Sequence, residues 1–358
     1  MSGGPLRFGI IGAGNIGNVH MKVLSGLAEE AVMTAVTDVY LPLAEMRARE
    51  YGIPTVYKTV EELVNDDAID AVVIGVPNKY HAPIAIQALR AGKHVVLEKP
   101  MASNAEEARQ IVKVQRETGK ILMVPHQMRW DSLNMQVKEQ AANGEFGRIY
   151  NAKTGWMRRK GIPGWGTWFT QKAESGGGPL IDIGVHMLDL ALYLMGNPKP
   201  VSVYGSTYAE FGPRKRGIGT WGTPNWNGFY DVEDLATALI KMEDGSTLTL
   251  DVSWAVHGDL ENNGGFVHLN GSEGGAVIRG NKGKLFLEKY GRAVDVELEP
   301  NPKAENARVL MFRHFVECVR EGKQPISNAL TGYTNNLILE AIYESSRTGG
   351  EVKLNWDI

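Results

Sequence analysis

A glycine-rich turn near the start of the chain constrains the fold more than any other feature. The apolar run Leu6–Ile11 predicts a buried strand, and a helical pattern covers residues 15–28. Between them lie Gly12, Gly14 and Gly17. Glycines at this spacing, between a buried strand and a helix, are typical of the first turn of a parallel, doubly wound sheet. The turn therefore predicts that the chain begins with an α/β domain.

The rest of the first third repeats this alternation of strand and helix. Further strands are predicted at residues 31–37, 54–57, 71–76, 93–97 and 121–124, with helices at 41–51, 59–64, 80–91 and 104–118. Such alternation indicates a parallel sheet covered by helices on both faces. We therefore expect an α/β Rossmann domain over residues 1–125.

The pattern changes after residue 125. Longer, partly alternating strands are predicted at residues 147–157, 201–210, 234–242, 247–254, 266–270, 274–278, 284–288 and 294–298, with helices after Gly178 and at 305–320 and 330–346. This succession favours an α+β domain with a large, mostly antiparallel open sheet over residues 126–358. Whether the C-terminal helices pack back on the Rossmann domain is left open. The glycine- and aromatic-rich stretch 211–231 has no periodicity, which is typical of a functional loop.

Composition narrows the functional classes. A chain of 358 residues is long for a single core and favours two domains. A net charge of −3 gives no reason to expect nucleic acid or a membrane surface as a partner. The single Cys318 excludes an internal disulfide framework and a cysteine-ligated zinc site, and we expect no metal. Without a secretory signal or an apolar run of about 18 residues, a soluble cytoplasmic protein is expected.

The glycine turn and Asp38 predict a bound dinucleotide. Gly12 allows the tight turn, Gly14 leaves space for the pyrophosphate, and Gly17 lets helix and strand pack closely. Asp38 ends the second strand, where a carboxylate accepts hydrogen bonds from ribose hydroxyls and repels a 2′-phosphate, so NAD is favoured over NADP. The residues expected to bind the cofactor here are Gly12, Gly14, Asn15, Ile16, Gly17 and Asp38.

Two further segments lie at the carboxyl edge of the predicted sheet, where ligands bind in such folds. Pro77 and Asn78 follow the fourth strand, with His81 shortly after, and are expected to contact the nicotinamide half. A helix start with Asn78 as cap and His81 in the first turn explains the same residues. Glu98 and Lys99 follow the fifth strand, and Lys99 is expected to contact the cofactor. Glu98 is either an ion-pair partner of Lys99 or a cofactor contact.

Three side chains have the chemistry to manage a hydroxyl proton. Lys99 can donate a hydrogen bond to a substrate hydroxyl and stabilise negative charge on its oxygen. Asp182 and His186 are four residues apart at the start of an apolar helical pattern, so they share a face if the helix has begun. An imidazole is a suitable base near neutral pH, and a nearby carboxylate orients it. The other reading makes Asp182 a helix cap and His186 a core histidine.

These motifs together resemble the Gfo/Idh/MocA family, named after glucose-fructose oxidoreductase, inositol dehydrogenase and a rhizopine-catabolism protein. The resemblance runs nearly end to end, through the glycine turn, Pro77-Asn78-x-x-His81, Glu98-Lys99-Pro100 and the segment from Gly176 to His186. It implies that Lys99, Asp182 and His186 are catalytic, with His186 as the base. It also implies an NAD-dependent dehydrogenase acting on sugars, sugar derivatives or cyclitols, and a cis bond between Lys99 and Pro100.

The resemblance also implies that the second domain supplies the substrate wall and the contact of a homodimer or homotetramer. Aromatic rings stack on sugars and arginine hydrogen-bonds hydroxyls. The expected substrate contacts are Lys99, Trp156, Arg158, Trp165, Trp168, Asp182 and His186, with His257 as a further candidate.

Two other functions stay open at this point. A regulator that senses NAD(P) without chemistry would bind the cofactor and reduce none of it. A glycosidase that acts through transient NAD-dependent oxidation would keep its cofactor and need none added. A zinc-dependent alcohol dehydrogenase is disfavoured, because the chain lacks the cysteine ligands that such sites often use.

Overall fold

The computed structural model describes residues 4–258 and 264–358, which form two compact units. Unit 1 contains the chain up to Gln127 together with Glu305–Asn336 and Ile358. Unit 2 contains Met128–Ala304 and Leu337–Asp357. The first division thus lies two residues beyond residue 125, where the sequence placed it, and a C-terminal segment belongs to the N-terminal unit.

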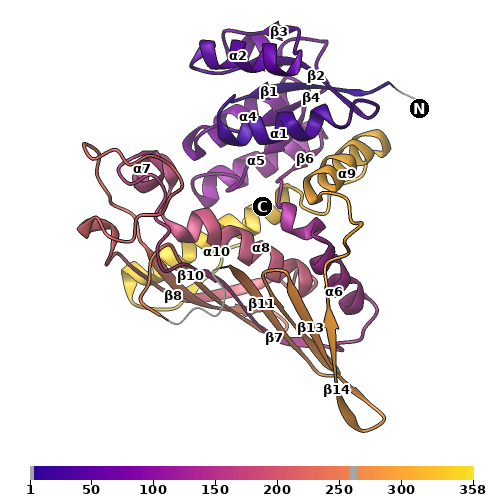
Figure 1. Ribbon diagram of the computed structural model, residues 1–358, viewed down its shortest axis with the longest axis vertical. Helices are drawn as coiled ribbons and strands as arrows, with labels where there is room; N and C mark the ends of the chain where they lie inside the picture. Colours follow the sequence, from indigo (N-terminus) through magenta and orange to yellow (C-terminus); the bar gives the residue numbers. More distant parts are fainter. Residues whose placement is uncertain (1–3, 259–263) are drawn as a thin grey trace. The chain divides into compact units, whose positions relative to one another are not determined.

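Unit 1 is built on a six-stranded sheet of order β3-β2-β1-β4-β5-β6, in which all pairs are parallel. The strands are β1 (Leu6–Ile11), β2 (Ala31–Thr37), β3 (Thr55–Val56), β4 (Ala71–Ile74), β5 (His94–Leu97) and β6 (Leu122–Met123). The helices between them are α1 (Asn15–Ser25), α2 (Leu41–Tyr51), α3 (Val60–Val64), α4 (His81–Arg90) and α5 (Ala105–Thr118), drawn in indigo and purple in Figure 1. The predicted Rossmann domain is confirmed.

The core of unit 1 joins the two ends of the chain. Helix α9 (Ala307–Glu321) places Phe312 and Phe315 against Phe8 of β1, with ring centroids 6.2 and 5.9 Å apart. All three rings are fully buried. Burial of an aromatic side chain stabilises a fold by about 1.5–3 kcal/mol, so α9 is an integral part of this unit.

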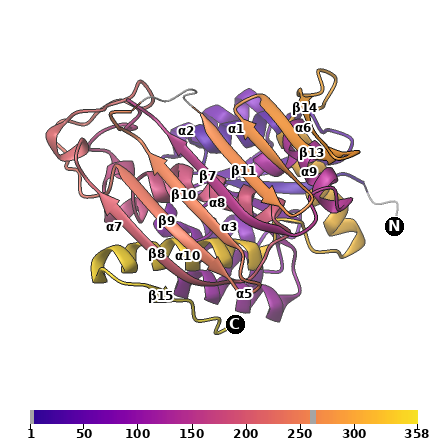
Figure 2. The same cartoon turned by 90° about the horizontal axis from the view of Figure 1, so that it is seen from below.

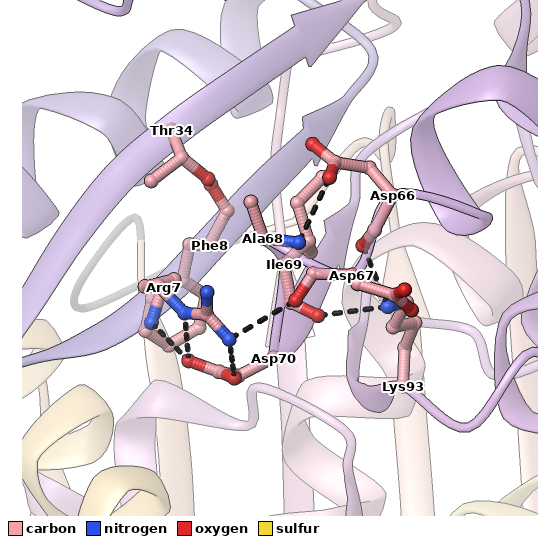
Figure 3. A network of polar contacts seen from close by, with 9 residues as sticks. All are labelled: Arg7, Phe8, Thr34, Asp66, Asp67, Ala68, Ile69, Asp70 and Lys93. Carbon is pink, nitrogen blue, oxygen red and sulfur yellow. Dashed lines mark hydrogen bonds and ion pairs between the residues drawn. The ribbon is translucent and has the colours of Figure 1, made fainter. Parts of the chain in front are cut away.

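Polar contacts tie together the amino ends of the central strands (Figure 3). The Arg7 guanidinium at the start of β1 donates to Asp70, which precedes β4, at 2.6 and 2.9 Å. Burial alone would raise the pKa of Asp70, but its bonds with Arg7 outweigh burial and lower it. Lys93, which precedes β5, donates to the carbonyl oxygens of Asp66 and Ile69 at 2.8 Å. The carboxyl ends of these strands therefore lie together at the opposite edge.

Unit 2 is built on a nine-stranded sheet of order β14-β13-β12-β11-β7-β10-β9-β8-β15. Its strands are β7 (Ile149–Met157), β8 (Pro200–Tyr208), β9 (Leu235–Met242), β10 (Thr247–Ser253), β11 (Gly265–Gly271), β12 (Gly274–Arg279), β13 (Lys282–Lys289), β14 (Arg292–Leu298) and β15 (Val352–Lys353). Among the strand pairs that the structure describes, only β7 and β10 run parallel. The predicted large, mostly antiparallel sheet is confirmed (Figure 2).

One face of this sheet carries the core of unit 2. Helix α8 (Val185–Leu194) packs on β7, β10 and β11, and α6 (Ser132–Ala142) packs against α8. Helix α10 (Ala329–Thr348) adds Ile338, Leu339 and Ile342 to the same buried cluster. The short α7 (Lys172–Ser175) precedes α8, and 83% of the apolar window in the stretch Lys172–Leu194 is buried inside the protein. This stretch, although long and apolar enough by composition to cross a membrane, is thus placed as a core segment.

Candidate functional site

The glycine turn has the shape that a dinucleotide requires. Gly12 has a φ of +97°, and a Cβ there would lie 2.4 Å from the carbonyl oxygen of Gly75. A Cβ on Gly17 would lie 2.0 Å from the carbonyl oxygen of Gly12, so the start of α1 is pressed against the turn. A Cβ on Gly14, in contrast, meets nothing within 4 Å among the described residues. Gly12 and Gly17 are therefore required by the protein itself, whereas the space at Gly14 is left for a ligand.

The start of α1 suits a phosphate group. Its first turn contains no acidic residue, and the N-cap Gly14 provides no side chain to bond the first N–H groups. Helix α5 differs, because Asn104 caps it and Glu106 and Glu107 lie in its first turn. Uncapped N–H groups and the positive end of the helix dipole attract anions. These residues fit the pyrophosphate of NAD.

Asp38 is fixed at the end of β2, beside the turn. Its carboxylate accepts hydrogen bonds from the backbone N–H groups of Ala13, at 2.7 Å, and Tyr40, at 2.8 Å. These bonds hold a negative charge next to the glycine turn, in the position from which it would meet an adenosine ribose.

The carboxyl ends of β1, β4 and β5 are neighbours, because these strands are adjacent and parallel. The strand order reverses between β1 and β4, which is where such sheets bind ligands. The segment Pro77–Asn78 follows β4, and Asn78 begins a single 3-10 turn (Asn78–Tyr80) before α4. His81 is buried, and its Nδ1 and Nε2 lie 2.7 and 2.9 Å from the carbonyl oxygens of Pro100 and Val76. Burial lowers the pKa of His81, and the two carbonyl groups act in the opposite direction. The ring thus ties the loop after β4 to the loop after β5.

Glu98 and Lys99 follow β5, and the peptide bond between Lys99 and Pro100 is cis, as the resemblance implied. The Glu98 carboxylate lies 2.8 Å from Nε2 of His20 on α1 and accepts the backbone N–H of Lys99 at 3.0 Å. Burial alone would raise the pKa of Glu98, but the bond and charge of His20 and the charge of Lys99 outweigh burial and lower it. Glu98 is therefore ionised and supports the backbone of Lys99.

Asp182 and His186 lie together in unit 2. Residues Leu180–Gly184 form a π-helical turn that leads directly into α8, so Asp182 lies in the turn and His186 in the first turn of α8. The indole N–H of Trp254, which is fully buried, donates to Asp182 at 3.1 Å. π-Helical turns within helices are frequent at functional sites. The predicted placement of this pair at a helix start is borne out by the geometry.

Arg158 lies near the Asp182 carboxylate. Burial lowers the pKa of Arg158, and the negative charge of Asp182 acts against that change. The guanidinium stacks over the ring of Trp156 at 4.8 Å. The Trp156 Nε1 is buried and has no hydrogen-bond partner among the described residues. Arg158, Trp156 and Asp182 therefore form one polar and aromatic surface within unit 2.

The other aromatic candidates gather around the loop 211–231. Trp165 is buried, donates its indole N–H to the carbonyl oxygen of Gly212 at 2.8 Å, and stacks on Trp226. Trp168 is half-buried beside Phe169, and the exposed His257 packs edge-on against Phe211. The indole N–H of Trp165 is thus bonded within the protein, and its ring supports the neighbouring side chain of Trp226.

Four residues that contribute to this region were not predicted from the sequence. Trp254 bonds Asp182, and His20 bonds Glu98. Glu233 accepts backbone N–H groups at the start of the Asp182 turn, and Tyr343 donates its hydroxyl to Glu233. No local pattern distinguishes these four residues, since each acts through a tertiary contact. Lys99 belongs to unit 1 and the pair Asp182–His186 to unit 2, and their joint action stays a prediction.

Comparison with known proteins gives matches over nearly the whole chain. A model of an oxidoreductase family with an NAD-binding Rossmann fold matches residues 6–126. A model of the C-terminal alpha/beta domain of the same oxidoreductase family matches residues 138–354. The two models together cover both units.

Individual relatives match end to end. D-glucoside 3-dehydrogenase of Escherichia coli (strain K12) is 32% identical over 356 residues, which are 99% of each chain. The NAD(+)-dependent scyllo-inositol 2-dehydrogenase of Bacillus subtilis (strain 168) is 28% identical over 98% of this chain and 96% of its own. The fold is also that of a levoglucosan dehydrogenase solved with NADH and levoglucosan, with a TM-score of 0.86, 24% identity, and coverage of 98% and 100%.

Proposed function

Because the chain belongs to the Gfo/Idh/MocA family of NAD-binding oxidoreductases, we propose that it transfers a hydride between NAD and a secondary hydroxyl of a sugar, sugar derivative or cyclitol. The relatives named above support this substrate class, since they are named as dehydrogenases of a glucoside and of an inositol. The oxidised product is the corresponding ketone.

The observation that carries the proposal is the arrangement of Asp182 and His186. Both leave one helix start, and the Asp182 carboxylate is held by the indole N–H of Trp254 at 3.1 Å. A fixed carboxylate beside an imidazole orients the ring and stabilises its protonated form. The His186 imidazole can therefore accept a hydroxyl proton, and Asp182 stabilises the protonated ring.

Each residue has one role in the proposed reaction. The His186 imidazole takes the proton of the substrate hydroxyl, and Asp182 stabilises the imidazolium that results. The Lys99 ammonium group donates to the same oxygen and stabilises the negative charge that develops there. NAD, when bound, supplies the nicotinamide carbon that receives the hydride. The cofactor contacts of Gly12, Gly14, Asn15, Ile16, Gly17, Asp38, Pro77, Asn78, His81 and Glu98 belong to this proposal.

Specificity belongs to unit 2 in this proposal. Arg158 and Trp156 lie on one surface with Asp182, and a planar cation beside an aromatic ring suits a polyhydroxylated ring. Trp165 and Trp168 are proposed as the further substrate contacts. Trp165 is buried, its ring stacks on Trp226 and its N–H donates to Gly212, so it would act mainly by supporting the side chains around it.

The test is a screen for NAD reduction over inositols, glucose derivatives and glycosides, with the wild type, Lys99→Ala and His186→Ala. Lys113→Ala, which removes an exposed lysine of α5, serves as the matched control. Loss of a general base typically lowers kcat by about 10²–10⁴-fold, and we expect this for His186→Ala and at least about tenfold for Lys99→Ala. The control retains wild-type rates.

Other outcomes of the same screen contradict the proposal. If both variants kept the wild-type kcat on a true substrate, the assigned roles would be wrong. Binding of NAD without reduction by any polyol would indicate a cofactor-sensing regulator. Cleavage of glycosides by purified protein without added NAD would indicate the glycosidase reaction instead. A preference for NADP over NAD would contradict the role given to Asp38.

A further inference from the structure

Glu233 is a buried carboxylate that receives hydrogen bonds from the start of the Asp182 turn and from one tyrosine. The backbone N–H of Gly178 donates to its two oxygens at 3.0 and 2.9 Å, and the N–H of Leu180 donates at 3.0 Å. The hydroxyl of Tyr343 donates to Oε1 at 3.0 Å. Buried carboxylates with this many donors hold the donating backbone in one place.

The backbone that Glu233 holds is the one that places Asp182. The carbonyl oxygen of Gly178 accepts the N–H groups of Ile181 and Asp182, at 3.1 and 3.0 Å. One residue, Gly178, therefore bonds Glu233 through its N–H and Asp182 through its carbonyl group. The π-helical turn and His186 follow without a break. A shift of Gly178 would move both side chains of the catalytic pair.

The glycines before this turn fit the same contact. A Cβ on Gly178 would lie 2.1 Å from the carbonyl oxygen of Glu233, and a Cβ on Gly177 would lie 1.9 Å from the Tyr343 hydroxyl. Both distances are far shorter than any side chain tolerates. Gly177 and Gly178 thus let the backbone approach Glu233 and Tyr343, which gives a physical reason for the glycine run.

Asp234, the next residue, holds a different segment. Its carboxylate accepts the backbone N–H groups of Phe211 and Gly212, at 2.6 and 2.9 Å. The carbonyl oxygen of Gly212 in turn accepts the indole N–H of Trp165 at 2.8 Å. Glu233 and Asp234 directly precede β9, and their carboxylates bind different segments of the chain. The Glu233 carboxylate therefore binds the start of the Asp182 turn, and the Asp234 carboxylate binds the start of the loop 211–231.

We propose that Glu233 and Asp234 are positioning residues with separate tasks: Glu233 fixes Asp182 and His186 for proton transfer, and Asp234 fixes the loop start and Trp165 for substrate binding. The proposal rests on the proposed function, because it takes its two tasks from the roles given there to Asp182, His186 and Trp165. It adds a division of labour between two adjacent carboxylates.

Steady-state kinetics of Glu233→Ala, Glu233→Gln and Asp234→Ala separate the two tasks. Misplacement of a reacting group by about 1 Å can lower the rate about 10²-fold, so Glu233→Ala is expected to lose at least about tenfold in kcat. Glu233→Gln keeps an oxygen for Gly178, Leu180 and Tyr343 and is expected to recover most of this loss. Asp234→Ala is expected to raise KM about fivefold and to change kcat by less than about twofold.

The matched control is Glu243→Ala, which removes an exposed glutamate paired with Lys199 at the far end of β9 and retains wild-type kinetics. Each kcat is referred to the folded fraction, measured by thermal unfolding. A Glu233→Ala enzyme that unfolds at lower temperature but keeps its kcat would reduce Glu233 to a stabilising residue and overturn the proposal. Equal effects of Glu233→Ala and Asp234→Ala on kcat and KM would overturn the division of tasks.

Amide hydrogen exchange tests the same contacts without any turnover. Glu233→Ala is expected to speed exchange at least about tenfold in peptides covering residues 176–187, and Glu233→Gln is not. Asp234→Ala is expected to speed exchange in peptides covering residues 208–216 only. Unchanged exchange at 176–187 in Glu233→Ala overturns the positioning role. If the wild type turned over no substrate, the proposed function would fail, while this measurement would still decide whether Glu233 fixes the turn.

Discussion

The charge of Glu98 shows how one residue connects separate segments of unit 1. This carboxylate is buried, yet its pKa is lowered because the hydrogen bond and charge of His20 and the charge of Lys99 outweigh the cost of burial. His20 comes from α1, the helix that begins at the glycine turn. The same carboxylate accepts the backbone N–H of Lys99. One ionised residue therefore connects the helix of the cofactor turn with the loop that carries the proposed lysine.

The partly buried His94 gives a pH dependence that can be measured. Burial, with the charge of Lys120, lowers the pKa of His94 to about 4, and its Nδ1 accepts the N–H of Ile121. The unfolded chain takes up a proton at His94 below about pH 6.5, whereas the folded chain does so only near pH 4. Stability is therefore lost as the pH falls through this window, by about 1 kcal/mol at pH 5 after allowing for solvent screening.

Denaturant unfolding at pH 7 and pH 5 checks this expectation for the wild type and His94→Asn. Asparagine keeps an acceptor for Ile121 and does not titrate. The wild type should lose about 1 kcal/mol more free energy of unfolding than the variant between the two pH values. The same loss in both proteins would show that His94 does not titrate in this window.

At the scale of elements, the turn between β1 and α1 contains glycines that are needed for different reasons, one for the fold and one for the cofactor. Gly17 is required by the fold, because a Cβ would meet the carbonyl oxygen of Gly12 at 2.0 Å. Gly14 has open space around it among the described residues. We expect Gly17→Ala to lower the free energy of unfolding by about 2 kcal/mol or more, and Gly14→Ala by less than about 1 kcal/mol. The Gly14→Ala methyl group would instead occupy the approach of the pyrophosphate, so NADH affinity should fall at least about tenfold.

Unfolding curves and NADH fluorescence titrations of both variants measure these two effects. The wild type is the reference for both. Wild-type NADH affinity in a folded Gly14→Ala protein would remove Gly14 from the cofactor site.

Elements of the regular pattern were predictable, and those that depend on distant partners were not. Strand β2 and helix α2 begin and end at the residues predicted from the sequence. Helix α1 ends at Ser25, three residues before the predicted end, because Gly26 caps it. Helix α6 and strand β15 were missed, since α6 has a weak apolar periodicity and β15 is a pair of residues defined by its pairing with β8.

The residues of the candidate site also fall into a predictable group and a group that depends on distant contacts. Gly12, Gly14, Gly17, Asp38 and Lys99 follow strand ends, and strand ends can be read from apolar runs. The π-helical turn under Asp182 could not be predicted, because Glu233 holds it from a position 55 residues away from Gly178. The contact of Trp254 with Asp182 was hidden for the same reason.

At the scale of the whole molecule, the nine-stranded sheet has a face that suits a second copy of the chain. Tyr204 and Leu239 lie directly opposite each other on β8 and β9 and are 54% and 46% exposed. Phe286 on β13 is exposed as well. Apolar side chains on an exposed sheet mark association surfaces, and most soluble oligomers join identical surfaces. We propose that the homodimer or homotetramer expected from the sequence forms through this face.

Light scattering after size-exclusion chromatography tests this assembly. The wild type is expected to have the mass of a dimer or tetramer, and Leu239→Arg, which buries a charge in the contact, that of a smaller species. Tyr290→Arg is the control, because Tyr290 is fully exposed at the turn between β13 and β14. A monomeric wild type, or an unchanged mass in Leu239→Arg, would contradict an interface at this position.

Helix α9 joins unit 1 from the far end of the chain, and this affects the protein while it is being made. Phe312 and Phe315, which pack on Phe8, leave the ribosome some 300 residues after it. At 5–20 residues per second this delay lasts roughly 15–60 s. During that time the strands of unit 1 exist with part of their apolar surface uncovered. The nascent chain, rather than the finished enzyme, is therefore the form most in need of a chaperone.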